Sequence, residues 1–228
     1  YPAEGFKPIH IERIASQAPG STPQEKLVQL IQDVCPTGEK ISSIGVAAPG
    51  PINPKAGVVY HAPNIAELRY FPLVEFLEEQ IRVPVFLDND ANLATVGEWK
   101  AGAAIGHNHL VYLTISTGIG GGVISDGQLL HGVQGMAAEL GHITVLPEGP
   151  LCSCGKQGHL EALASGPSIT RWTEAEIQNS TVSSLQGNDK ISAKTIAQAA
   201  QQGDKLALAA FQRAGYYVGI ALANFLHT

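Results

Sequence analysis

Two cysteines and two histidines that could ligate a metal ion lie close together in the chain. His142, Cys152, Cys154 and His159 follow one another at intervals of 10, 2 and 5 residues, within an 18-residue segment rich in glycine and proline. Two thiolates and two imidazoles can complete the closed tetrahedral shell that usually holds structural zinc. The alternative is two buried free cysteines beside unrelated histidines, but packing alone gives little reason for this spacing. The pattern predicts a zinc loop over residues 142–159.

A glycine-rich run, Thr117–Gly122 (TGIGGG), follows an apolar segment. Its unhindered backbone amides and its hydroxyl group suit the phosphate chain of a nucleotide. The run is not GxxxxGK[ST], and no helix follows it directly, so it matches neither a P-loop nor a dinucleotide fingerprint. A turn that simply requires glycine is the alternative interpretation.

Carboxylates that could act as acids or bases accompany both motifs. Asp88, Asn89 and Asp90 close an apolar strand and face the start of a helix, where such residues also serve simply as N-caps. Glu139 lies three residues before His142, so one helical turn would project both from the same side. Glu161 follows the zinc loop, and a surface charge is its alternative role.

The segments that must position these residues alternate between strand and helix patterns. Short apolar, β-branched runs predict strands, and apolar residues at helical spacing predict helices. The expected strands are 41–48, 58–62, 83–87, 109–116 and 123–125, and the expected helices are 22–34, 72–80, 88–100 and a long pattern over 193–227. This alternation predicts an α/β architecture.

Composition narrows the classes of function. With 228 residues and 44% hydrophobic content, the chain can bury a sizeable core. A net charge of -6 and a pI near 5.7 give no attractive field for nucleic acid or anionic lipid, so we expect neither as a partner. We expect no membrane span, a cytoplasmic location, and, from an odd count of three cysteines, a reducing compartment.

Taken together and in this order, the motifs resemble the ROK family of bacterial sugar kinases and sugar-responsive repressors. The resemblance covers about residues 41–166. It rests on GVAAPGPIN (45–53), APN (62–64), DNDANLATVGE (88–98), TISTGIGGGVISDGQLLHG (114–132), AAELGHI (137–143) and CSCGKQGHLEALASG (152–166).

The resemblance implies a role for each matching residue. Asp90 is expected to be the catalytic base, with Asn89 beside it holding a sugar hydroxyl. His142 is expected to bind zinc through one ring nitrogen and to face the sugar with the other. Further sugar contacts are implied at Asn64, Glu139 and Glu161. The expected ATP-binding residues are Thr117, Gly118, Gly120, Gly121 and Gly122, with Mg-ATP and zinc as cofactors.

The resemblance also implies the fold: a two-lobed actin/hexokinase-like (ribonuclease H-like) ATPase fold with sugar and ATP in the cleft between the lobes. The expected lobes are residues 1–90 and 91–228, in a homodimer or homotetramer. The sequence departs from the family in three ways. His159 stands where a third cysteine is commoner, no DxGGT strand precedes Tyr1, and no adenosine-binding segment follows Thr228. We therefore expect the chain to be part of a longer protein.

The resemblance leaves several functions open. We expect a glucokinase-like hexose kinase, with an N-acetylhexosamine or fructose kinase as its close neighbour. A sugar-sensing repressor would use the same fold and would need a helix-turn-helix domain ahead of this chain. A purely structural zinc module would leave the TGIGGG and NDAN motifs without a purpose.

Overall fold

The computed structural model describes residues 8, 10–15, 20–35, 38, 40–62 and 65–227. Contacts within the chain divide it into two compact units. The first comprises Tyr1–Leu110 and Ile124–Ala137, and the second comprises Val111–Val123 and Ala138–Thr228. The lobes expected at 1–90 and 91–228 stay a prediction.

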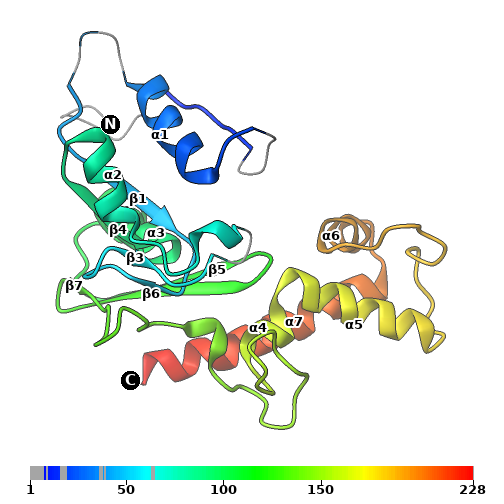
Figure 1. The fold of residues 1–228 in the computed structure, drawn as a ribbon. Helices are drawn as coiled ribbons and strands as arrows, with labels where there is room; N and C mark the ends of the chain where they lie inside the picture. The colour runs from blue at the N-terminus through cyan, green and yellow to red at the C-terminus, as the bar shows by residue number, and fades with distance from the viewer. Residues whose placement is uncertain are drawn as a thin grey trace. The chain divides into compact units, whose positions relative to one another are not determined.

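The first unit contains short sheets and the helices that accompany them (Figure 1). Thr22 caps the first helix and Glu25 bonds back to the Thr22 backbone, which confirms the predicted start. Buried apolar residues of this unit include Ile52, Val59, Leu73, Leu77 and Leu87. The elements up to residue 101 are α1 (Pro23–Val34), β1 (Ile44–Ala48), β2 (Ile52–Asn53), β3 (Val58–Val59), the 3-10 helix η1 (Ala66–Leu68), α2 (Leu73–Ile81), β4 (Val85–Asn89) and α3 (Asp90–Ala101).

β1 and β4 pair in parallel, from Ile44 opposite Val85 to Ala48 opposite Asn89. Parallel strands end at the same edge of a sheet, so Asn89 lies beside the turn that follows β1. The predicted strand over 41–48 begins only at Ile44. β1 is also buried less fully than predicted, because its residues alternate between the two faces of the sheet. One of these faces is exposed, as Phe86 on the neighbouring strand β4 shows with 67% exposure.

A three-stranded sheet contains β5 (Leu110–Ile115), β6 (Ile119–Ser125) and β7 (Gln128–Leu129) in that order. Within this sheet, the boundaries between the two units along the chain fall after Leu110 in β5 and after Val123 in β6. The prediction of a glycine loop over 117–122 is wrong in its extent. Only residues 116–118 form the turn, while Gly120, Gly121 and Gly122 lie inside β6.

Packing explains why glycines occupy this strand. A Cβ atom on Gly121 would lie 2.6 Å from the Tyr112 carbonyl oxygen and 2.6 Å from Cδ1 of Leu140. A Cβ on Gly141 would collide with the Ile119 carbonyl oxygen. These glycines let the β6 backbone approach its neighbours closely, which is a tertiary requirement rather than a loop requirement.

The rest of the second unit is mainly helical. Its core includes Leu160, Ile196 and Ala207, each 0% exposed. In Figure 1, α4 and α5 lie against α7, and α6 also contacts α7. The elements are the 3-10 helix η2 (Leu140–His142), α4 (Leu160–Ala164), α5 (Gly166–Gln178), α6 (Ala193–Gln201) and α7 (Lys205–Leu226).

Among the described residues, α7 is the one helix long and apolar enough to cross a membrane by length and composition. This differs from our expectation that no segment reaches that length. Its alanines, however, pack against α4, α5 and α6. Arg213 on this helix donates a hydrogen bond to the Leu163 carbonyl oxygen at 3.1 Å, and its guanidinium lies 5.6 Å from the Trp172 ring. These contacts hold one face of α7 against its own unit, and 28% of its apolar window is buried.

Candidate functional site

Asn89 caps α3 with its side-chain carbonyl group. Its Oδ1 atom accepts hydrogen bonds from the backbone N–H groups of Ala91 at 2.9 Å and Asn92 at 3.3 Å. The capping role considered from the sequence is therefore confirmed. These two donors also fix the orientation of the amide, because only the oxygen can accept. The Nδ2 group points toward Gly50, where a Cβ atom would lie 3.2 Å from it, and it has no acceptor among the residues that the structure describes.

Asp90 begins α3 and is exposed. One carboxylate oxygen, Oδ1, accepts a hydrogen bond from the Ala91 backbone N–H at 2.8 Å. Among the described residues, none donates to its other oxygen, Oδ2. A free carboxylate oxygen beside an amide donor can accept a proton from a hydroxyl group that the donor holds.

In the second unit, His142, Cys152, Cys154 and His159 come together as predicted, with their ligand atoms all within 4.8 Å of one another. Sγ of Cys152 lies 3.6 Å from Nδ1 of His142, and Sγ of Cys154 lies 3.2 Å from Nδ1 of His159. Tetrahedral zinc at ordinary bond lengths separates such atoms by about 3.3–3.8 Å. The donor set and these two distances therefore suit a zinc ion.

Burial in this cluster favours neutral side chains in the absence of a cation. Burial raises the pKa of the Cys152 thiol. Burial and the neighbouring His142 lower the pKa of His159. A neutral imidazole is the form that binds a metal ion, whereas a buried thiol needs a nearby positive charge to ionise. A bound cation would supply that charge.

Glu161 ties the metal loop to the turn before β6. Its Oε2 atom accepts a hydrogen bond from the Ile119 backbone N–H at 3.0 Å, and its Oε1 atom accepts one from Ser153 Oγ at 2.9 Å. The Cys152 thiol also points at Oε1, at 3.7 Å. A Cβ on Gly118 would lie 2.6 Å from Oε2, so glycine leaves room for this carboxylate. Glu161 therefore has structural partners, and a sugar contact by this residue stays a prediction.

Glu139 and His142 lie on one tight turn, as the spacing suggested. Glu139 immediately precedes η2, and its carbonyl oxygen accepts a hydrogen bond from the His142 N–H at 3.0 Å. Glu139 is exposed, whereas His142 is half-buried because its Nδ1 atom faces the Cys152 thiol. The Nε2 atom of His142 lies on the opposite side of the ring, in keeping with a second role outside the metal shell.

The predicted ATP-binding residues divide between turn and strand. Thr117 and Gly118 lie in the turn between β5 and β6, and Thr117 is exposed. Gly120, Gly121 and Gly122 lie in β6, and the last two are buried. Thr117 is therefore the exposed member of the run, while Gly118 and Gly120 are half-buried.

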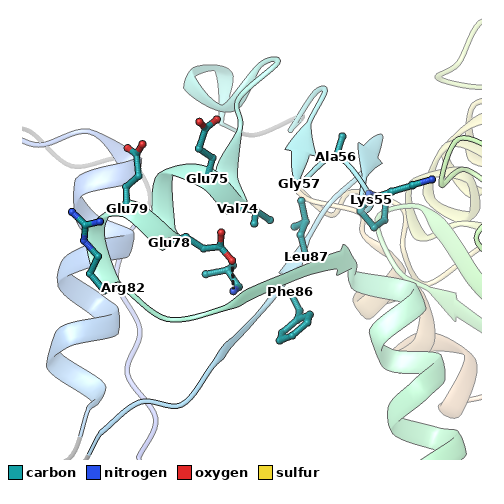
Figure 2. A pocket seen from close by; sticks show the side chains of 12 residues that line it. Lys55, Ala56, Gly57, Val74, Glu75, Glu78, Glu79, Arg82, Phe86 and Leu87 are labelled. Atoms are coloured by element: carbon teal, nitrogen blue, oxygen red, sulfur yellow. Dashed lines mark hydrogen bonds between the residues drawn. The ribbon is translucent and has the colours of Figure 1, made fainter.

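Two of the hollows in the described part of the first unit lie near the predicted site residues in the sequence. A cavity of about 650 Å³ is lined by Asn53, Pro54, Lys55, Ala56, His131, Gly132, Val133 and Gly135. The second hollow is a groove of about 530 Å³. Figure 2 shows the side chains that line it, among them Glu75, Glu78 and Glu79 on α2 and Phe86 on β4. None of the described residues that line either hollow is a predicted site residue.

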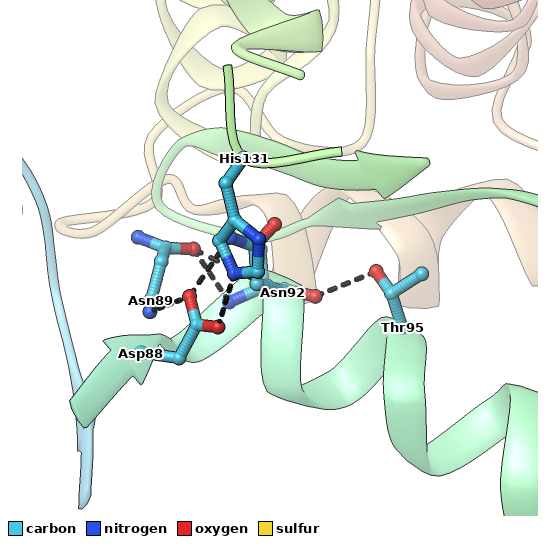
Figure 3. Close-up of polar contacts among 6 residues, drawn as sticks. Asp88, Asn89, Asn92, Thr95 and His131 are labelled. Atoms are coloured by element: carbon cyan, nitrogen blue, oxygen red, sulfur yellow. Dashed lines mark hydrogen bonds and ion pairs between the residues drawn. The ribbon is translucent and has the colours of Figure 1, made fainter. Parts of the chain in front are cut away.

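One polar contact was not predicted from the sequence. His131 Nε2 lies 2.7 Å from Oδ2 of Asp88, the residue that precedes Asn89 (Figure 3). No motif spacing links these residues, which are 43 positions apart. The predicted sugar ligand Asn64 lies outside the described residues. Of the other predicted sugar ligands, Asn89 and Asp90 are fixed in the first unit, and Glu139, His142 and Glu161 are fixed in the second.

Comparison with known proteins identifies the family. The chain is 45% identical over 186 residues to a glucokinase of Halalkalibacterium halodurans, covering 79% of this chain and 56% of the relative. It thus spans just over half the length of that protein. A glucokinase from Streptomyces griseus, solved in complex with glucose and AMPPNP, superposes with a TM-score of 0.72 at 36% identity, covering 89% of this chain and 67% of that one.

Regulators share the same fold. A ROK family transcriptional regulator, homologous to the E. coli MLC protein, superposes with a TM-score of 0.80 at 32% identity, covering 89% of this chain and 52% of that one. The sequence profile of the ROK family matches residues 6–228. The actin/hexokinase-like α/β fold expected from the motifs is that of these relatives. The chain belongs to the ROK family.

Proposed function

We propose that the full-length protein is an ATP-dependent sugar kinase that transfers the γ-phosphoryl group of ATP to a hydroxyl group of a hexose. The observation that carries this proposal is the exposed Asp90 carboxylate beside the Asn89 amide donor at the end of β4. The likeness to glucokinases, one of them solved with glucose and AMPPNP, supports it. Glucose is therefore favoured over an N-acetylhexosamine or fructose as the substrate.

In this mechanism Asn89 Nδ2 donates a hydrogen bond to the reacting sugar hydroxyl, and Asp90 Oδ2 accepts the proton of that hydroxyl. The hydroxyl oxygen forms a new bond to the γ-phosphorus, and the bond from that phosphorus to the β,γ-bridging oxygen breaks to release ADP. A positioned general base contributes about 10²–10⁴-fold to such a transfer. Asn64, Glu139, His142 and Glu161 are proposed to hold the remaining sugar hydroxyls.

ATP binding is proposed for Thr117, Gly118, Gly120, Gly121 and Gly122. Within this set, the turn residues Thr117 and Gly118 are the members suited to contact phosphate oxygens, because the three later glycines lie in β6. Mg²⁺ that accompanies ATP would offset the charge developing on the transferred phosphoryl group. The protein's own contribution is orientation, which is the larger part of catalysis in this class of reaction.

We also propose that His142, Cys152, Cys154 and His159 hold a structural zinc ion. Zinc would fix the plane of the His142 imidazole through Nδ1 and so orient Nε2 toward the sugar. Metal analysis of purified protein should find about one zinc per chain, as a closed site with these ligands implies. Cys154→Ser should lose the zinc, while the control Cys35→Ser, outside the cluster, should keep it. Stoichiometric zinc in the Cys154→Ser protein would refute this ligand set.

A sugar-sensing repressor is the second candidate, because the transcriptional regulator shares this fold with a TM-score of 0.80. Such a protein would bind sugar without consuming ATP. The test is a coupled ADP-release assay of the full-length protein with Mg-ATP and a panel of hexoses and N-acetylhexosamines. Sugar-dependent ADP formation supports the kinase. Sugar binding by calorimetry with no turnover on any sugar would favour the repressor.

A cytoplasmic location and a homodimeric or homotetrameric assembly accompany the kinase proposal. Sedimentation of the purified full-length protein tests the assembly, since a monomer at micromolar concentration would contradict it.

A further inference from the structure

The Asp88 carboxylate joins three parts of the first unit (Figure 3). Its Oδ1 atom accepts hydrogen bonds from the Asn89 backbone N–H at 2.7 Å and from Asn92 Nδ2 at 2.9 Å. Its Oδ2 atom lies 2.7 Å from His131 Nε2. An ionised carboxylate can only accept, so Nε2 carries the hydrogen and donates it. The side chain of Asp88 is only 15% exposed, so these partners take the place of most of its water.

Two of these bonds fix the first turn of α3. Asn92 is 3% exposed, and Asp88 is the acceptor that satisfies its buried amide. The hydrogen bond from the Asn89 N–H group to Asp88 holds the backbone of the residue that caps the helix. Asp90 is the next residue, so its direction depends on the same turn. Asp88 therefore contacts the turn from which the side chains of Asn89 and Asp90 project.

The third bond comes from a separate segment, residues 130–137, which follows β7. The Ala137 N–H donates to the His131 carbonyl oxygen at 3.1 Å, which closes this segment on itself. Gly135 packs so closely on Pro54 that a Cβ would lie 2.7 Å from Pro54 Cδ. The backbone of His131 is thus held independently of Asp88, and its side chain, which is 42% exposed, reaches Asp88 from this segment.

We propose that Asp88 and His131 form a positioning pair that holds Asn89 and Asp90 in the orientation that sugar phosphorylation requires. The inference rests on the proposed kinase function. Neither residue of the pair is assigned a contact with the sugar. His131 is proposed to act through Asp88, because its Nε2 atom contacts the Oδ2 atom of that carboxylate.

The test compares two substitutions of His131 in the full-length protein. His131→Gln keeps a side-chain N–H donor, whereas His131→Leu has none. A small displacement of a reacting group lowers kcat strongly, while it changes the thermal stability of the protein little. We therefore expect His131→Leu to lower kcat about tenfold, and His131→Gln to retain kcat within about threefold. A purely structural role would change thermal stability and leave kcat unchanged.

A double variant tests whether His131 acts through Asp88. Asp88→Ala combined with His131→Leu should lower kcat no further than Asp88→Ala alone, because the shared contact is already lost. Full wild-type kcat in the His131→Leu protein would overturn the proposal. Equal losses of kcat in His131→Gln and His131→Leu would also overturn it. So would a double variant whose loss of kcat is the product of the losses in the two single variants.

Hydrogen exchange separates failure of this proposal from failure of the kinase proposal. The Ala91 and Asn92 amides, which bond to Asn89 Oδ1, should exchange several-fold faster in His131→Leu than in wild type or His131→Gln. A wild-type protein that phosphorylates no sugar would refute the kinase proposal while this comparison still reports on the pair. Unchanged exchange at both amides in His131→Leu would refute the pair itself.

Discussion

Asn89 is proposed both to cap α3 and to hold the sugar, and substitution can separate the two roles. Serine is as good an N-cap as asparagine, but its side chain ends too early to present a donor at the Nδ2 position. Alanine provides neither group. Asn89→Ser should therefore keep the helix cap and lose the sugar donor, whereas Asn89→Ala should lose both.

The size of each effect follows from the contacts. Asn89 Oδ1 accepts two backbone N–H groups, and loss of such a cap costs about 1 kcal/mol, which is about 2–4 °C in Tm for a chain of this size. Loss of one hydrogen bond to the sugar costs about 1.4 kcal/mol, which is about tenfold in affinity. Asn89→Ser should keep the wild-type Tm within about 1 °C, since serine caps equally well.

Thermal unfolding and sugar titration calorimetry of the three proteins measure both quantities. The expected result is that Tm falls only in Asn89→Ala, while sugar affinity falls about tenfold in both variants. Wild-type sugar affinity in Asn89→Ser would refute the donor role and leave Asn89 as a cap alone. A Tm loss in Asn89→Ser equal to that in Asn89→Ala would refute the capping argument.

Three further predictions concern stability and the metal. Gly121→Ala should lower the free energy of unfolding by about 1–3 kcal/mol in urea titration, because its Cβ would overlap the Tyr112 carbonyl and Leu140; an unchanged midpoint would contradict this. The free energy of unfolding of Asp204→Asn should be about 1 kcal/mol below that of wild type at pH 7, and this difference should shrink between about pH 4 and pH 2. A difference that stays constant over this pH range would contradict the prediction. Zinc removal by a chelator should weaken sugar binding through His142, and equal affinities with and without metal would refute the link.

The Asp204 prediction follows from the hydrogen bonds at the start of α7. Burial opposes its charge, but N–H groups of Ala207 and Ser184 and hydroxyls of Ser184 and Ser183 outweigh that effect and lower its pKa from 3.8 to about 2. A carboxyl group whose pKa is lowered by folding stabilises the folded state at pH values above its pKa in the unfolded chain. That stabilisation disappears as the pH falls through its pKa in the folded protein. Because the carboxylate is partly exposed, solvent screening reduces the contribution to about 1 kcal/mol.

Local patterns were enough to predict the elements whose signals lie within a few residues. The Thr22 to Glu25 capping box predicted the start of α1, and the acidic turn at 88–90 predicted the start of α3 to within two residues, since the helix expected from Asp88 begins at Asp90. The cluster of His142, Cys152, Cys154 and His159 was also predictable, because its four side chains come from one short segment.

Features set by long-range packing could not be read from local sequence. The Gly120–Gly122 run resembles a loop because glycine is frequent in turns, yet these residues lie in β6. Nothing near Gly121 in the sequence reveals that Leu140 will press against it. The pairing of His131 with Asp88 joins positions 43 residues apart and follows no motif, so only the folded chain shows it.

The most direct test of the account is the Asp90→Asn variant of the full-length protein, measured for both turnover and sugar binding. Asparagine keeps the shape of the side chain but cannot accept the hydroxyl proton. We predict that kcat falls by about 10²–10⁴-fold while the sugar Kd stays within about threefold of wild type. Turnover equal to that of the wild type would contradict the assignment of Asp90 as the general base.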